Sequence, residues 1–85
     1  MDIWYSPRFA RQYKKLPPLV KLLAEKREAI FRVDPFDLRL KTHALSGPFN
    51  GCYAFSINHT YRIIFEFKDA KTIHFCQVGT HAIYD

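Results

Sequence analysis

Four side chains suited to proton transfer or phosphate binding come from distant parts of this 85-residue chain: His43, Arg62, His81 and Tyr84. Histidine takes up and releases protons near neutral pH, and the planar fork of arginine binds phosphate oxygens in pairs. Metal-free RNA cleavage needs such groups. A base removes the proton of the 2′-hydroxyl, an acid protonates the departing 5′-oxygen, and a cation stabilises the charge on phosphorus. These residue types therefore suit that reaction, provided that the fold brings them together.

Each candidate also has a plain structural interpretation. His81 lies near the end of the chain and would be solvated there, and His43 could bond neighbouring backbone in a loop. Arg62 would belong to a solvated strand face. His59 is typical of a turn residue, and His74 of a histidine satisfied within a sheet. The residues alone leave both interpretations open.

Motifs for other chemistries are missing from the sequence. The three glycines form no phosphate-binding loop, and the histidines show no HxH or HExxH spacing. No serine sits in a nucleophile-bearing turn motif. Cys52 and Cys76 are isolated, which favours two reduced, buried thiols over a disulfide or a metal pair. We expect no metal and no cofactor.

The charge is concentrated in the first half of the chain. The net charge is +5, and residues 1–41 hold ten basic and five acidic side chains, whereas the remainder holds three of each and all four histidines. Such a basic half suits a polyanion or an acidic protein partner, although a solvated lysine-rich helix face would have the same composition.

The elements that must position the candidates change type part-way along the chain. Residues 3–5 read as a short strand, and Ser6-Pro7 as the start of a helix. Phe9, Tyr13 and Leu16 recur with helical spacing. Pro17-Pro18 separates this helix from a second one that ends at Asp34-Pro35. The pattern predicts a two-helix hairpin.

Alternation of period two then predicts strands around residues 42–45, 51–58, 61–68 and 72–78, joined by short turns. Helices followed by strands favour an α+β fold, with the two-helix hairpin packed on one face of an antiparallel sheet. The length allows one domain over residues 1–85. Tyr53, Phe55 and Phe65 fall on the apolar side and should form core, so an RNA-stacking platform on the open face is disfavoured.

No apolar run approaches the roughly 18 residues of a membrane span, and the N-terminus lacks a signal-peptide core. We therefore expect a cytoplasmic protein without membrane contact.

Four segments together resemble the RelE/ParE superfamily of type II toxins, including its RelE, YoeB and YafQ branches. They are YSPRFARQYKKLP, DPFDLRLKTHALSG, GCYAFSINHTYRIIFEF and VGTHAIYD, which cover nearly the whole chain. The most specific feature is the order of K-x-H-x-L-x-G, S-I-N-x-x-Y-R-I-I-F and G-T-H. The resemblance implies a curved antiparallel sheet under two helices and a ribosome-dependent mRNA endonuclease neutralised by a co-expressed antitoxin.

The resemblance also implies roles for single residues. His43 would be the general base, Arg62 the cation at the scissile phosphate and His81 the general acid. Tyr84 would orient or stack a base. The acidic and histidine residues of the YafQ branch on the central strand are replaced by Ala54 and Ser56. RNA would also be bound by six basic residues: Arg39, Lys41, Arg8, Arg11, Lys14 and Lys15.

The expected partners are the ribosome with its mRNA and a cognate acidic antitoxin, which would bind a monomeric toxin. Two other functions stay open at this point. A ParE-like protein would inhibit DNA gyrase by binding, without nuclease activity. A toxin-like fold could also have lost its activity.

Overall fold

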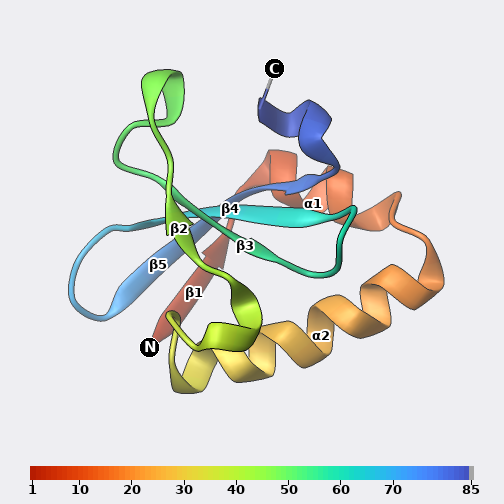
Figure 1. Cartoon of the computed structure of the whole chain (residues 1–85), viewed down its shortest axis with the longest axis horizontal. Helices are drawn as coiled ribbons and strands as arrows, with labels where there is room; N and C mark the ends of the chain where they lie inside the picture. Colours follow the sequence, from red (N-terminus) through yellow and green to blue (C-terminus); the bar gives the residue numbers. More distant parts are fainter. Residues whose placement is uncertain (85) are drawn as a thin grey trace.

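A five-stranded sheet organises the computed structural model, which describes residues 1–84 (Figure 1). Asp85, the last residue of the expected domain, lies outside the described residues. Across the sheet the strands follow the order β1-β5-β4-β3-β2. Their bounds are Asp2–Tyr5 (β1), His43–Ala44 (β2), Tyr53–Ser56 (β3), Arg62–Phe67 (β4) and Thr72–Gly79 (β5). Each strand predicted from the alternation is therefore present.

The sheet is mixed, which corrects the expectation of an antiparallel sheet. β2, β3, β4 and β5 pair antiparallel, but β1 pairs parallel with β5, with Ile3 opposite Ile73. Tight turns fix the direction of β3, β4 and β5 because a short connection can only reverse the chain. No tight turn joins β1 to β5, so the sequence pattern left the direction of β1 unspecified.

Two helices cover one face of the sheet, as the sequence predicts. α1 (Pro7–Lys14) begins where the Ser6 hydroxyl accepts a hydrogen bond from the Phe9 backbone N–H at 2.9 Å. Such a cap is worth about 1 kcal/mol. α2 (Pro18–Val33) starts at the second proline of the pair and is followed by Asp34 as its C-cap. Proline fits the first turn of a helix because its missing N–H would have no partner there.

The core lies between the helices and the sheet and is largely aromatic. Phe31 of α2 is fully buried. Its ring stacks on Phe55 with centroids 5.0 Å apart and meets the edges of Phe65 and Phe75 at 4.9 and 5.2 Å. Such aromatic pairs add about 0.5–1.5 kcal/mol beyond the burial of their area. The apolar side of β3 and β4 is thus buried in the core, so its aromatic rings are not available to stack on RNA bases.

The opposite face of the sheet is partly covered, which simple alternation does not reveal. Ala54 and Ile64 point away from the helices yet are 0% and 1% exposed. Three short 3₁₀ turns complete the chain: η1 (Leu38–Leu40), η2 (Gly47–Phe49) and η3 (His81–Tyr84). Figure 1 shows η2 and η3 on the side away from α2. Within residues 1–84, no helix combines the length and apolar character that a membrane crossing requires.

Candidate functional site

A cavity of about 390 Å³ gathers the four residues singled out from the sequence. His43, Arg62, His81 and Tyr84 all line it. The rest of its wall comes from the segment around η2, namely Leu45, Ser46, Pro48 and Phe49. Side chains that are up to 41 residues apart in the sequence therefore face one space.

Strand register brings these residues to the same region. Arg62 begins β4 and lies between Ser56 of β3 and Gly79 of β5. η3 follows β5 immediately, and the Ile83 backbone N–H donates to the Thr80 carbonyl at 3.1 Å to close its turn. His81 therefore enters the cavity from the strand next to Arg62. β2 is paired with β3, where His43 lies opposite Ala54.

His43 is oriented by the backbone just before it in the sequence. Its Nδ1 lies 3.1 Å from the Lys41 carbonyl oxygen. A carbonyl oxygen only accepts, so Nδ1 carries a proton and, in the neutral ring, Nε2 is the proton acceptor. Lys41 has φ +55°, a left-handed conformation that costs a residue with a Cβ on the order of 1 kcal/mol. The turn that aims the imidazole is thus locally strained.

Arg62 is held from two sides. Its Nη1 donates to the Ser56 hydroxyl at 3.0 Å, and its Nη2 lies 3.2 Å from Nε2 of His81. The guanidinium can only donate, so Nε2 of His81 is the acceptor and the ring is neutral in this arrangement. No acidic side chain within residues 1–84 pairs with Arg62. The half-buried guanidinium therefore has an uncompensated positive charge.

Tyr84 lines the cavity beside His81. Its ring packs against His81 with centroids 5.8 Å apart and edge-on against Phe49 at 6.3 Å. Its hydroxyl is buried without a hydrogen-bond partner among the described residues. Burial raises the pKa of Tyr84 above its ordinary value, against the opposing effect of Arg62. The phenol therefore stays protonated at neutral pH and does not serve there as a base.

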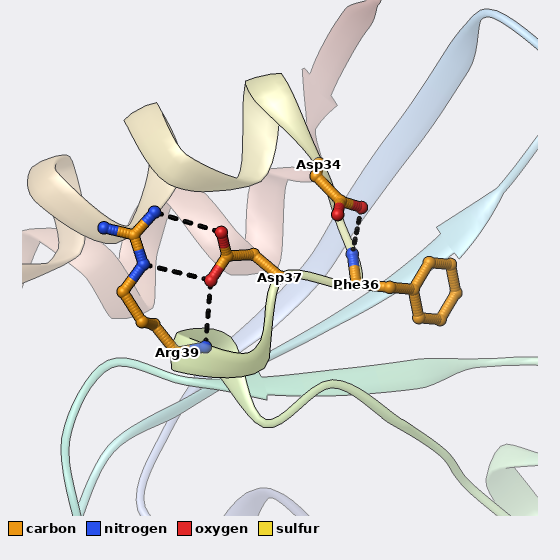
Figure 2. Close-up of polar contacts among 4 residues, drawn as sticks. All are labelled: Asp34, Phe36, Asp37 and Arg39. Atoms are coloured by element: carbon orange, nitrogen blue, oxygen red, sulfur yellow. Dashed lines mark hydrogen bonds and ion pairs between the residues drawn. The ribbon is translucent and has the colours of Figure 1, made fainter.

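Arg39 and Lys41 line a second cavity of about 270 Å³, which also includes Arg62. Figure 2 shows that Arg39 is already paired with the Asp37 carboxylate, through Nε–Oδ1 and Nη2–Oδ2 contacts of 3.0 Å each. This pairing lowers the pKa of Asp37 to about 2. A phosphate would have to compete with that carboxylate for Arg39, whereas Lys41 forms no ion pair within the described chain.

The other predicted RNA-binding residues lie elsewhere. Four basic side chains are exposed on or just after α1, and none of them lines either cavity: Arg8, Arg11, Lys14 and Lys15. They therefore lie outside both cavities, and their predicted binding of RNA stays a prediction.

The sequence matches no protein-family model and no curated protein. Solved structures do resemble the chain over nearly its whole length. YafQ from Escherichia coli strain BL21(DE3) is 23% identical, with a TM-score of 0.73 over 98% of this chain and 96% of that one. A YoeB/ParE toxin from Agrobacterium tumefaciens is 14% identical, with a TM-score of 0.80 over 95% and 99%. The YoeB–YefM complex from Staphylococcus aureus is 19% identical, with a TM-score of 0.78 over 95% of this chain and 97% of that one.

The chain has a RelE-like toxin fold. The expected fold class, two helices on one face of a sheet, is thereby confirmed. Identities this low speak for the fold alone, so the chemistry must be argued from the residues of this chain.

In this RelE-like fold, two other histidines keep their structural interpretation. His74 stacks on Trp4 with centroids 5.8 Å apart and lies 3.9 Å from the Glu66 carboxylate, on a part of the sheet outside the cavity. His59 is exposed in the β3–β4 turn, where the Asn58 side chain accepts hydrogen bonds from the backbone N–H groups of Thr60 and Tyr61. Neither lies in the cavity that holds Arg62 and His81.

Sequence reasoning missed the contribution of Ser56 and of the η2 wall. The short connection of five residues, 57–61, between β3 and β4 already indicates that Ser56 lies opposite Arg62. Phe49 has no such signal, because it joins the site by packing against Tyr84, 35 positions further along the chain.

Thiols and clustered metal ligands play no part in this geometry. No group of three or more His, Cys, Asp or Glu side chains gathers within residues 1–84. Cys52 and Cys76 are free thiols. Burial, with smaller effects from Glu66 and Cys52, raises the pKa of Cys76 to about 11, so this thiol is a poor nucleophile at neutral pH.

Proposed function

We propose that this protein is the toxin of a type II toxin–antitoxin system and cleaves mRNA on the ribosome without a metal. One observation carries the proposal: two imidazoles and a guanidinium line a single cavity, and the guanidinium has no acidic partner among residues 1–84. The site would use the 2′-hydroxyl of the RNA as the nucleophile, so the protein supplies only proton transfers and charge stabilisation.

His43 would act as the general base. Its Nδ1 is engaged by the Lys41 carbonyl, so Nε2 is available to take the proton of the 2′-hydroxyl. The 2′-oxygen then bonds to phosphorus and the bond to the 5′-oxygen breaks. This gives a 2′,3′-cyclic phosphate on one fragment and a 5′-hydroxyl on the other.

Arg62 and His81 would act on the phosphate and the leaving group. A phosphate bound to Arg62 replaces the contact between Nη2 and His81, and its negative charge favours the protonated imidazole. His81 then gives its proton to the departing 5′-oxygen. Arg62 offsets the charge that develops on the non-bridging oxygens, and Tyr84 would orient or stack a neighbouring base.

The proposed setting is the cytoplasm, where ribosomes translate mRNA. Exposed basic residues of α1, among them Arg8 and Arg11, would add salt-sensitive contacts to ribosomal RNA.

The partner would be an acidic, partly disordered antitoxin that folds on binding. YafQ and YoeB are seen in complexes with DinJ and YefM, respectively. In this chain β1 and β2 are the edge strands of the sheet and could accept an added strand. Co-expression of such a partner should relieve growth arrest caused by this protein, and unrelieved arrest would count against the partner.

Single-turnover cleavage of mRNA on stalled ribosomes tests the nuclease. Arg62→Ala and His81→Ala should each lower the rate by roughly 10²–10⁴, the usual effect of removing a positioned acid, base or charge stabiliser. The matched controls are Arg32→Ala, an exposed α2 residue paired with Glu28, and His74→Gln. Both controls should stay close to the parent rate. Rates for Arg62→Ala and His81→Ala within about threefold of the parent would reject the assignment.

A second candidate is inhibition of DNA gyrase by binding alone. The observation in its favour is that one of the similar structures is described as a YoeB/ParE toxin, at a TM-score of 0.80. A pure binding protein does not need two histidines and an arginine in one cavity. Expression in bacterial cells separates the two functions, because gyrase poisoning induces a DNA-damage response first, whereas mRNA cleavage stops translation first.

A further inference from the structure

The second cavity, of about 270 Å³, shares Arg62 with the first and is strongly basic. Its lining includes four basic side chains, Arg27, Arg39, Lys41 and Arg62, and no acidic one, although Arg39 is paired with the Asp37 carboxylate beside it. Arg27 comes from the middle of α2 rather than from the sheet, and no sequence motif indicates a role for it. The two cavities therefore meet at the guanidinium that we place at the scissile phosphate.

Arg27 is anchored in a way that leaves most of its donors unused. Its Nε donates to the Ile57 carbonyl oxygen at 3.3 Å, which ties α2 to the end of β3. The side chain forms no ion pair within residues 1–84 and is half-buried. The Nη groups, with four of the five N–H donors of a guanidinium, are not engaged by that bond.

Two half-buried guanidinium groups in one cavity repel each other, and partial burial weakens the screening of that repulsion by water. The ion pairs elsewhere in the molecule bring acidic groups to exposed cations, as in the Arg32–Glu28 and Lys68–Glu66 pairs. Among residues 1–84, no acidic group pairs with Arg27 or Arg62. An anion in the second cavity would remove the repulsion, and phosphate matches the fork of arginine.

We propose that the second cavity binds a second backbone phosphate of a single-stranded nucleic acid, held mainly by Arg27 and Lys41. The substrate strand would cross Arg62, with one phosphate beside His43 and His81 and an adjacent phosphate between α2 and the β3–β4 turn. The identity of this strand as the cleaved RNA rests on the proposed function; the phosphate site itself does not.

Binding of an oligodeoxynucleotide of four thymidines tests the proposal without chemistry, because the strand lacks the 2′-hydroxyl nucleophile. We would measure its affinity for the full chain by fluorescence anisotropy between about 0.05 and 0.2 M salt. Arg27→Gln should weaken binding and reduce the slope of log affinity against log salt by about 0.7, the loss expected for one phosphate contact on a single strand.

Two matched variants complete the experiment. Lys26→Gln removes the same charge from an exposed neighbouring position on α2 that lines neither cavity, and it should leave the slope unchanged. Arg27→Lys keeps the charge but loses the hydrogen bond from Nε to the Ile57 carbonyl. It should therefore retain most of the slope of log affinity against log salt, which distinguishes the effect of the charge from an effect on folding.

The proposal is overturned if Arg27→Gln and Lys26→Gln have the same slope. It is equally overturned if Arg27→Gln weakens only the binding of an acidic protein partner, since the cavity would then be a protein contact. If Arg27→Gln reduces the slope but the parent protein does not cleave mRNA, the phosphate site is supported and the proposed nuclease function is rejected.

Discussion

The charge on Arg62 is positioned by neutral groups. The hydroxyl of Ser56 and Nε2 of His81 accept its hydrogen bonds, so the guanidinium is oriented while its charge stays available to a ligand. A carboxylate in either place would orient it equally well but would cancel the charge. Ser56 is in this sense a positioning residue that acts through Arg62.

We expect Ser56→Ala to slow single-turnover cleavage about tenfold, because an arginine free to rotate spends less time at the phosphate. The effect should fall on the rate at saturating mRNA more than on the KM. The pH profile should keep the parent shape, since serine does not titrate in this range.

Ser56→Thr is the matched rescue variant, because it keeps the hydroxyl and threonine is well tolerated in strands. Its cleavage rate should approach that of the parent. Equal rates for Ser56→Ala and Ser56→Thr would show that the hydroxyl does not position Arg62.

At the scale of elements, the site depends on how η3 sits against the end of β5. A Cβ added at Gly79 would lie 2.6 Å from Cγ2 of Ile83, closer than real Cβ contacts. Gly79 is also the residue that pairs with Arg62 in the sheet. The absence of a side chain at this position therefore lets η3 pack closely enough to bring His81 to Arg62.

We predict that Gly79→Ala displaces η3 and lowers the cleavage rate at least about tenfold, since small misplacements of catalytic groups have effects of this order or larger. The core should remain intact, because the clash is confined to Ile83. Thermal unfolding followed by circular dichroism would verify that the variant folds.

A double variant tests the cause. Adding Ile83→Ala removes the Cγ2 atom that an alanine at position 79 would meet, so Gly79→Ala with Ile83→Ala should cleave faster than Gly79→Ala alone. Cleavage by Gly79→Ala at the parent rate would contradict this role of the contact.

Local elements were predictable from sequence wherever local chemistry determines them. The serine cap at Ser6, the break at Pro17-Pro18 and the β3–β4 hairpin follow from neighbouring residues, and all are present. The parallel pairing of β1 with β5 was not predictable, because it depends on contacts between residues about 70 positions apart.

At the scale of the whole molecule, the four predicted site residues are brought together by the successive pairing of β2, β3, β4 and β5 and by the turn η3 after β5. Their spacing in the sequence does not reveal this arrangement. Chemistry suggested which side chains to consider, and the resemblance suggested their roles, but only the folded chain shows that Arg62 connects two cavities. The basic residues that are concentrated in the first half of the sequence do not all lie in one place in the structure. Some of them lie at these cavities, and others lie on α1, outside them.

The central claim is that this protein cleaves RNA by attack of the 2′-hydroxyl on the adjacent phosphate. The most direct test is to identify the ends of mRNA fragments produced in a single turnover on stalled ribosomes. Attack by the 2′-hydroxyl should leave a 2′,3′-cyclic phosphate on the upstream fragment and a 5′-hydroxyl on the downstream fragment. A 5′-phosphate on the downstream fragment, or intact mRNA, would contradict it.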